Sequence, residues 1–254
     1  MVFADKHWDE LFAQGYTIVS GAIDDAHLRA AQDAANHLIA VHPDEGWERS
    51  KNESWREIRY CRHPAFMAVA TDVLDPLALQ ILETAPPADF VQFAVTMPGF
   101  ATKARVGHNF HLDGGQDRLL AVFNVLFGVA LTPVSSDTAG GFHILPGSHH
   151  KYAAEFMRQP DDPSVHWGQV KLDYQPVLAE GARLVVPRVQ PGDIVVTHSF
   201  VAHGTSCNKS QARRDMLFQR RTAAPLLDPA TQAQERLAFM RDPWKFFRRR
   251  SAAV

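Results

Sequence analysis

The sequence has few cysteines and no excess of charge of either sign. Its 254 residues include only two cysteines, Cys61 and Cys207, which cannot form a disulfide framework and suggest a reducing compartment. Lysine and arginine (26) nearly balance aspartate and glutamate (28), so nothing in the composition points to nucleic acid or an anionic membrane. Internal repeats and low-complexity segments are also missing.

Long apolar runs are absent too. The longest, from Leu119 to Leu131, is interrupted by Asn124 and is too short to span a bilayer. The first residues carry acidic and polar side chains before any apolar segment and do not resemble a signal peptide. These features predict a cytoplasmic protein that binds no membrane, and 46% hydrophobic residues are enough for a packed core.

Hydrophobic periodicity predicts helices in the first third of the chain and strands after it. Helical spacing occurs at 6–13, 28–39, 64–71, 75–84 and 228–250, with Asp24 and Asp25 as N-cap candidates for the second helix. Strand-like segments lie at 15–19, 55–61, 90–96, 119–131, 142–145, 183–187, 194–198 and 216–220. We therefore expect an α+β fold, mainly β, built as a sandwich or jelly-roll barrel with helices packed on one sheet.

The same pattern predicts one domain over residues 1–254. Within it we expect a helix-rich N-terminal part (1–88), a jelly-roll core (89–223) and a helical tail (224–254). The basic tail at 245–250 would steer an anionic substrate, pack in a subunit interface or, as we favour, form a solvated helix end. The polar, aperiodic segments 43–54 and 161–175 are our hypothesis for lids of a pocket.

One stretch, 108–115, offers a candidate metal site. His111 and Asp113 lie two residues apart in extended sequence, so both side chains point to the same face of a strand. The same His-x-Asp spacing at His7 falls in a predicted helix and that at His42 closes one, where the geometry is unsuitable. A hydrogen-bonded polar pair at a barrel rim is the alternative reading of His111 and Asp113.

A third ligand should be a histidine on a neighbouring strand, distant in sequence. His198 lies in an apolar strand-like run, where a lone histidine is more often a core residue with one hydrogen bond. His203 is followed by Gly204 and Thr205, whose small side chains leave room beside a metal. We therefore prefer His203.

Several motifs occur together in a definite order. They are His111-Leu112-Asp113, the turn segment 141–149, Gly192-Asp193, and His203-Gly204 with Asn208, Ser210 and Arg214 in register. In this order the chain resembles the phytanoyl-CoA dioxygenase-like (PhyH) family of iron(II)- and 2-oxoglutarate-dependent oxygenases. The opening strand at 15–19 and its following helix are similar as well, so the resemblance covers about residues 9–221.

The resemblance implies a double-stranded β-helix, the cupin-like form of the jelly roll, with a facial triad of His111, Asp113 and His203. Such a triad holds Fe(II) and leaves three positions open for the cosubstrates 2-oxoglutarate and O2.

The resemblance also implies a site for the distal carboxylate of 2-oxoglutarate. Arg214 occupies the family's position for it, with Arg213 as the alternative if the strand register slips by one. An arginine suits the role because its planar fork binds a carboxylate bidentately. Thr205 would help to hold the same carboxylate, and Gln92 is a weaker candidate for contact with 2-oxoglutarate.

The implied reaction couples conversion of 2-oxoglutarate and O2 to succinate and CO2 with hydroxylation of an unactivated C–H bond. Asp113 disfavours halogenation, because related halogenases have a small residue there, whereas desaturation or cyclisation stay open. The substrate would be a small-molecule metabolite or natural product, and coenzyme A thioester binding is not implied. Candidate substrate contacts, which could equally be residues of the rim, are Arg105, His108, Asn109 and Gln116.

Two readings from other classes use the same residues. A metal-dependent hydrolase would activate water with the same triad, but it would need neither dioxygen nor a buried arginine at Arg214. A non-catalytic cupin-like binding protein would keep the barrel, although here no triad position has been lost. For oligomeric state, a monomer or homodimer is expected.

Overall fold

A computed structural model of the chain describes residues 2–41, 47–49, 54–101, 111–113, 122–158 and 183–249. The four candidate substrate contacts, Arg105, His108, Asn109 and Gln116, lie outside these ranges, as do the hypothetical lid at 161–175 and most of the one at 43–54.

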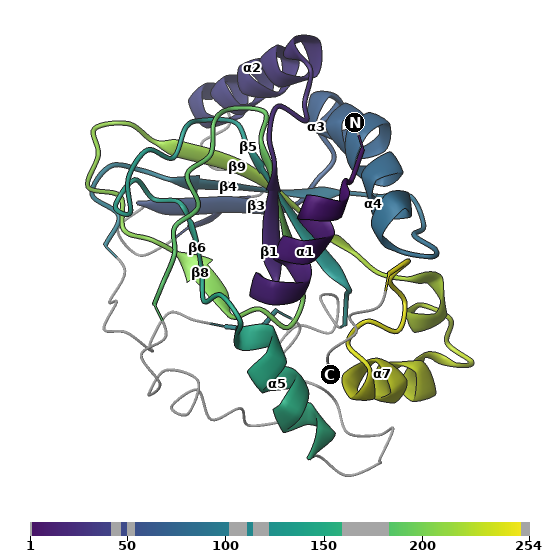
Figure 1. Cartoon of the computed structure of the whole chain (residues 1–254). Coiled ribbons are helices and arrows are strands. Elements are labelled where there is room, and N and C mark those ends of the chain that lie inside the picture. The colour runs from purple at the N-terminus through teal and green to yellow at the C-terminus, as the bar shows by residue number, and fades with distance from the viewer. Residues whose placement is uncertain are drawn as a thin grey trace.

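The described strands form two antiparallel sheets. A seven-stranded sheet has the order β1-β7-β5-β9-β4-β3-β2, and a smaller sheet pairs β6 with β8 (Figure 1). The bounds are β1 (Tyr16–Val19), β2 (Glu48–Arg49), β3 (Trp55–Cys61), β4 (Val91–Thr96), β5 (Val125–Ala130), β6 (Phe142–Ile144), β7 (Ile194–His198), β8 (His203–Thr205) and β9 (Arg214–Arg221). The predicted α+β class with antiparallel sheets is confirmed, while no ladder of the described residues closes the two sheets into a barrel.

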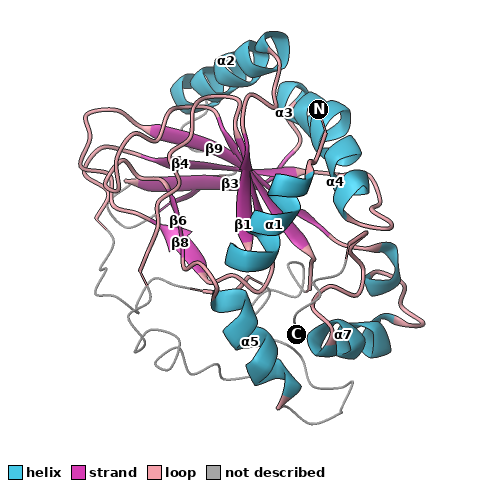
Figure 2. Cartoon of the chain, viewed as in Figure 1, coloured by secondary structure: helices cyan, strands magenta, loops and turns pink. Residues whose placement is uncertain are grey.

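Helices cover the face of the large sheet that points away from β6 and β8 (Figures 1 and 2). They are α1 (Asp5–Gln14), α2 (Asp25–Val41), α3 (Pro64–Val69) and α4 (Asp75–Ile81). Their apolar side chains form one core with those on this face of the sheet, among them Phe93, Phe127 and Leu217. Two more helices, α5 (Ser148–Met157) and α7 (Gln232–Arg241), contact each other.

The opposite face of the large sheet forms a second core against the small sheet. Ala94 of β4 pairs with Met216 of β9, and Gln92 pairs with Phe218, so these four side chains share one face. By the same alternation, Arg214 and Arg220 at the two ends of β9 also point into the space between the sheets. This space holds the candidate site.

Several predicted elements match closely. The helix at 6–13 is α1, and Asp24 does cap α2, because its Oδ1 accepts hydrogen bonds from the backbone N–H groups of Ala26 and His27. The strand at 55–61 has the bounds of β3. The division into parts at residues 88 and 223 stays a prediction.

Other elements differ from the prediction. The helices at 64–71 and 75–84 are one continuous helical stretch, since a turn of π-helix, Ala70–Leu74, joins α3 to α4. Of the strand predicted at 119–131, the described residues form a strand only over Val125–Ala130, which is β5. No strand forms at 183–187, where Val185 makes an isolated pair with Ile144.

The predicted helical tail at 228–250 is also wrong in part. Only α7 is helical, and after it the chain turns back on itself, so that Trp244, Phe246 and Phe247 are buried in the core. Arg248 and Arg249 are held by Leu79 O and Asp5, respectively. The tail is therefore a packed segment and not a solvated helix end.

The helical stretch Pro64–Ile81 is long and apolar enough, by length and composition, to cross a membrane, with a mean hydropathy of 1.2. Phe66, Leu77 and Ile81 are buried inside the protein, whereas Leu79 is 45% exposed. A helix of a packed core passes the same test of length and composition, and this stretch packs one apolar face into the core.

Candidate active site

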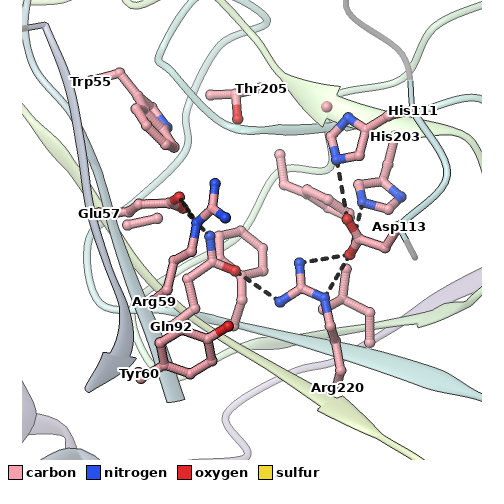
Figure 3. A pocket seen from close by; sticks show the side chains of 15 residues that line it. Trp55, Glu57, Arg59, Tyr60, Gln92, His111, Asp113, His203, Thr205 and Arg220 are labelled. Atoms are coloured by element: carbon pink, nitrogen blue, oxygen red, sulfur yellow. Dashed lines mark hydrogen bonds and ion pairs between the residues drawn. The ribbon is translucent and has the colours of Figure 1, made fainter. Parts of the chain in front are cut away.

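His111, Asp113 and His203 come together at the edge of the small sheet, although His203 lies far along the chain. His111 and His203 form an isolated antiparallel pair in which each backbone N–H donates to the other's carbonyl at 3.1 Å. Asp113 Oδ1 lies 3.2 Å from His111 Nε2, and Oδ2 lies 3.5 Å from His203 Nε2. One ligand atom from each residue lies within 4.8 Å of the others (Figure 3).

The surroundings prepare these three groups for a metal. His203 Nδ1 donates to Val201 O at 2.9 Å, which leaves Nε2 toward Asp113 with its lone pair available. Burial lowers the pKa of His203, which favours the neutral ring. Burial of Asp113 opposes its ionisation, but the opposing electrostatic effects, of which the charge of Arg220 is the largest, hold its pKa well below the usual range. A neutral His203 and an ionised Asp113 are the forms that bind a divalent metal.

Two imidazoles and one carboxylate on the same side of a metal are the facial donor set of non-heme iron(II) oxygenases. The described residues supply all three donors and no fourth, so a metal held here would keep open positions for other ligands.

A cavity of about 280 Å³ opens beside the triad. Aromatic side chains form much of its wall, namely Trp55, Tyr60, Phe142 and Phe218. Charged and polar groups complete it, and Figure 3 shows Glu57, Arg59, Gln92 and Arg220 on the side opposite His111.

Of the residues predicted to bind 2-oxoglutarate, Thr205 and Gln92 line this cavity. Gln92 accepts a hydrogen bond from Arg220 Nη1 at 2.8 Å and donates one to Glu57 Oε2. Its amide is thus already engaged on both sides.

Arg214 is buried between the sheets, with 1% of its surface exposed, and does not itself line the cavity. Its Nε donates to Gly140 O at 2.5 Å and its Nη1 to Ala94 O at 3.2 Å. No described carboxylate forms an ion pair with it. Burial lowers its pKa to about 10, so it is still charged at neutral pH. The charge of Asp215 offsets part of this effect, but a buried cation whose hydrogen bonds go only to neutral carbonyls is still expensive unless an anion joins it.

Arg213 points the other way. Its Nε lies 2.9 Å from Asp215 Oδ2, and Nη2 donates to Asn36 on α2. The register of β9 thus directs Arg214, and not Arg213, toward the inside of the fold.

The prediction that His198 is a core residue is confirmed by its contacts. The ring is fully buried, its Nε2 lies 2.9 Å from Pro243 O, and its Nδ1 accepts from Phe200 N at 3.0 Å. Burial lowers its pKa to about 4. It also stacks on Phe247 at 5.3 Å.

Five residues of the cavity wall were not predicted from the sequence, namely Trp55, Glu57, Arg59, Tyr60 and Arg220. The alternation along β9 from Arg214 carried a signal for Arg220, because every second residue of a strand shares a face. For Glu57 and Arg59, alternate positions on β3 indicated a common face but not which face met the cavity.

The two-sheet fold and the His-Asp-His triad define a non-heme iron(II) oxygenase. The sequence model of the family described as phytanoyl-CoA dioxygenase (PhyH) matches residues 12–216. The chain belongs to this family and is an Fe(II)- and 2-oxoglutarate-dependent dioxygenase. No curated protein matches the chain in sequence.

Solved structures of similar fold include SnoK, a non-heme alpha-ketoglutarate-dependent carbocyclase from nogalamycin biosynthesis, with a TM-score of 0.66 and 18% identity over 88% of this chain and 85% of that one. EctD from S. alaskensis with bound Fe has a TM-score of 0.61 and 17% identity, over 87% of this chain and 77% of that one. HygX from Streptomyces hygroscopicus with nickel, 2-oxoglutarate and hygromycin B bound has a TM-score of 0.57 and 15% identity, over 87% of this chain and 88% of that one. At these identities the likeness concerns the fold.

Proposed function

We propose that the enzyme hydroxylates an unactivated C–H bond of a small-molecule metabolite or natural product while 2-oxoglutarate and O2 become succinate and CO2. The observation that carries the proposal is the triad of His111, Asp113 and His203 at the wall of a cavity. Bound iron(II), with 2-oxoglutarate, supplies the activation of dioxygen. Asp113 fills the position that must be small for a halide to bind, so an oxygen-transfer outcome is favoured over halogenation.

Arg214 and Thr205 are proposed to hold the distal carboxylate of 2-oxoglutarate. The support is electrostatic, because Arg214 is buried and charged and contacts two carbonyl groups but no described carboxylate. A ligand carboxylate would compensate that charge and accept charge-assisted hydrogen bonds. Thr205 lies on the wall of the cavity and would add a hydroxyl donor.

The cavity walls suggest the kind of substrate. About 280 Å³ must accept 2-oxoglutarate as well, so the room left fits a small molecule or one end of a larger one. The aromatic walls would exclude water from the reacting carbon. HygX with hygromycin B bound, and SnoK from nogalamycin biosynthesis, favour a natural product by analogy of fold. A cytoplasmic location and a monomeric or homodimeric state stay predictions.

Desaturation or cyclisation is the second candidate outcome. SnoK is described as a carbocyclase and SnoN as an epimerase, so this fold serves more than one outcome. Mass spectrometry of the product separates the outcomes, since hydroxylation adds one oxygen atom whereas desaturation removes two hydrogen atoms.

The test is an anaerobic titration of the metal-free protein with iron(II) and 2-oxoglutarate, followed by the visible charge-transfer band of the chelate. We expect a band in the wild type, and in Arg214→Ala a requirement for roughly 10- to 100-fold more 2-oxoglutarate, the loss expected for a charged hydrogen bond. Arg213→Gln is the matched control, because its side chain contacts α2, and its titration should follow the wild type. The absence of a band from iron-loaded wild type would contradict the proposal, and zinc-dependent hydrolysis would be tested next.

A further inference from the structure

Arg220 lies inside the cavity against one oxygen of the metal-ligand candidate Asp113. Its Nε and Nη2 lie 2.8 and 2.6 Å from Asp113 Oδ2, and its Nη1 donates to Gln92 Oε1 at 2.8 Å (Figure 3). Only 16% of the Arg220 side chain is exposed. The other oxygen of Asp113, Oδ1, faces His111 at 3.2 Å and receives nothing from Arg220.

Arg220 is itself held by side chains of the neighbouring strands β4 and β3 in the large sheet. Gln92 donates to Glu57 Oε2, and Glu57 Oε1 accepts from Arg59 Nε at 2.7 Å. The Glu57 side chain is only 3% exposed, so this carboxylate is a fixed anchor and not a mobile surface group. The chain of hydrogen bonds therefore runs from β3 through β4 and β9 to Asp113.

We propose that Arg220 is a positioning residue that restricts Asp113 to binding the metal through one oxygen. A carboxylate whose two oxygens are both available can bind a metal through both, which would consume a position that a cosubstrate needs. By occupying Oδ2, the guanidinium leaves Oδ1 as the ligand atom on the side of His111. Gln92 acts through Arg220 in this scheme, by fixing the direction of the guanidinium.

The charge of Arg220 and its positioning of Asp113 have opposite effects on metal affinity. The guanidinium charge repels a cation, so an arginine that merely occupied the metal position would weaken binding. A positioning arginine strengthens binding, because removing it leaves Asp113 buried and misdirected. The change in metal affinity on removing Arg220 therefore separates the two roles.

The experiment is a titration of the metal-free, full-length protein with Co(II) in the absence of 2-oxoglutarate. Because neither substrate nor 2-oxoglutarate is present, the result does not depend on the proposed reaction. We expect Arg220→Gln to weaken Co(II) binding about 10- to 100-fold, the usual effect of losing a partner of a metal ligand. Arg220→Lys should recover part of the affinity, since an ammonium keeps the charge but cannot form the fork. The intensity of the Co(II) visible bands, which reports coordination number, should change in Arg220→Gln.

Arg188→Gln is the charge-matched control, because Arg188 pairs with Asp137 at the surface and does not line the cavity. Its Co(II) affinity should equal that of the wild type. Gln92→Leu should weaken binding less than Arg220→Gln, and should have no further effect in the Arg220→Gln background if it acts through Arg220. Circular dichroism shows whether each variant is folded. If Arg220→Gln does not fold, the Co(II) affinity of Gln92→Leu tests the proposal instead. Unchanged or tighter Co(II) binding by the folded variants would overturn the proposal.

Discussion

The guanidinium of Arg214 donates a hydrogen bond from Nε to the backbone carbonyl of Gly140 at 2.5 Å. The same carbonyl accepts from Thr96 Oγ1 at 3.1 Å. Gly140 has a φ of +72°, and a Cβ added to it would lie 2.2 Å from Thr96 Oγ1. The position of the carbonyl that orients Arg214 thus depends on a glycine.

Gly140→Ala should lower the free energy of unfolding by about 2 to 4 kcal/mol, because it combines a left-handed backbone with a clash in the interior. It should also weaken 2-oxoglutarate binding, since the acceptor of Arg214 shifts. Urea denaturation and the iron(II) titration measure the two effects. Gly99→Ala is the control, because Gly99 also has a positive φ, +82°, but an added Cβ would lie in open space. It should lower the free energy of unfolding by less than half as much as Gly140→Ala. Equal costs would show that the clash is relieved.

Substitution of His203 should remove metal binding, whereas substitution of His198 should lower stability. His203→Ala should abolish metal binding, as it deletes one of three ligands. His198→Ala should keep metal binding but lower stability by about 2 to 4 kcal/mol, because it leaves a cavity and deletes two buried hydrogen bonds. Co(II) titration and urea denaturation of both variants are the measurements. Loss of metal binding in a folded His198→Ala protein would contradict this division of roles.

The surface residue His27 should make stability depend on pH. It lies between Asp24 at 2.7 Å and Asp72 at 3.2 Å, and hydrogen bonds to these carboxylates raise its pKa above 6.5. A folded-state pKa above the unfolded value stabilises the protein below the unfolded pKa, and this contribution is lost as pH rises through the folded value. His27→Gln should therefore destabilise the protein more at about pH 5.5 than at about pH 8.5.

Denaturant unfolding of wild type and His27→Gln at both pH values provides the test. Below the usual aspartate range the contribution falls again, because Asp24 and Asp72, whose pKa values are lowered, become protonated. A difference between the two proteins that is the same at both pH values would rule out the ion cluster as its cause.

Trp244 should be the main anchor of the C-terminal segment. It is 2% exposed and packs edge to face on Phe12 at 4.7 Å and on Phe247 at 4.9 Å. Trp244→Ala should cost about 3 to 5 kcal/mol of unfolding free energy, the usual range for an aromatic core residue. Leu227→Ala, at a position 52% exposed, should change it by less than about 0.5 kcal/mol. Thermal or urea unfolding distinguishes the two, and a small effect at Trp244 would mean that the tail contributes little.

The metal ligands could be predicted because residues i and i+2 of extended sequence share a face. His111 and Asp113 do meet, although His111 makes only an isolated pair with His203 and Asp113 lies in a turn. His203 followed from the small residues beside it and from a family resemblance. Arg220 could not be predicted in the same way, since its contact with Asp113 depends on where β9 lies relative to a residue outside the large sheet. Strand alternation predicts which residues of a strand share a face. Only the tertiary structure shows which other residues pack against that face.

The C-terminal segment shows a different limit. Between Lys245 and Arg249 two aromatic residues lie among three basic ones, and charge density suggested a solvated helix. The burial of Phe246 and Phe247 against α4 and α7 prevailed, because two aromatic side chains gain more from burial than the flexible arginines lose at the surface.

The edge strand β1 has a consequence for synthesis on the ribosome. Its residue Ile18 pairs with Val195 of β7, so this strand leaves the ribosome long before its partner. At 5–20 residues per second the wait is roughly 10 to 40 s. His203 follows β7 by only a few residues, so the nascent chain acquires its last metal ligand at about the moment when its first strand finds a partner. A metal can therefore be bound by all three ligands only once most of the sheet has been made.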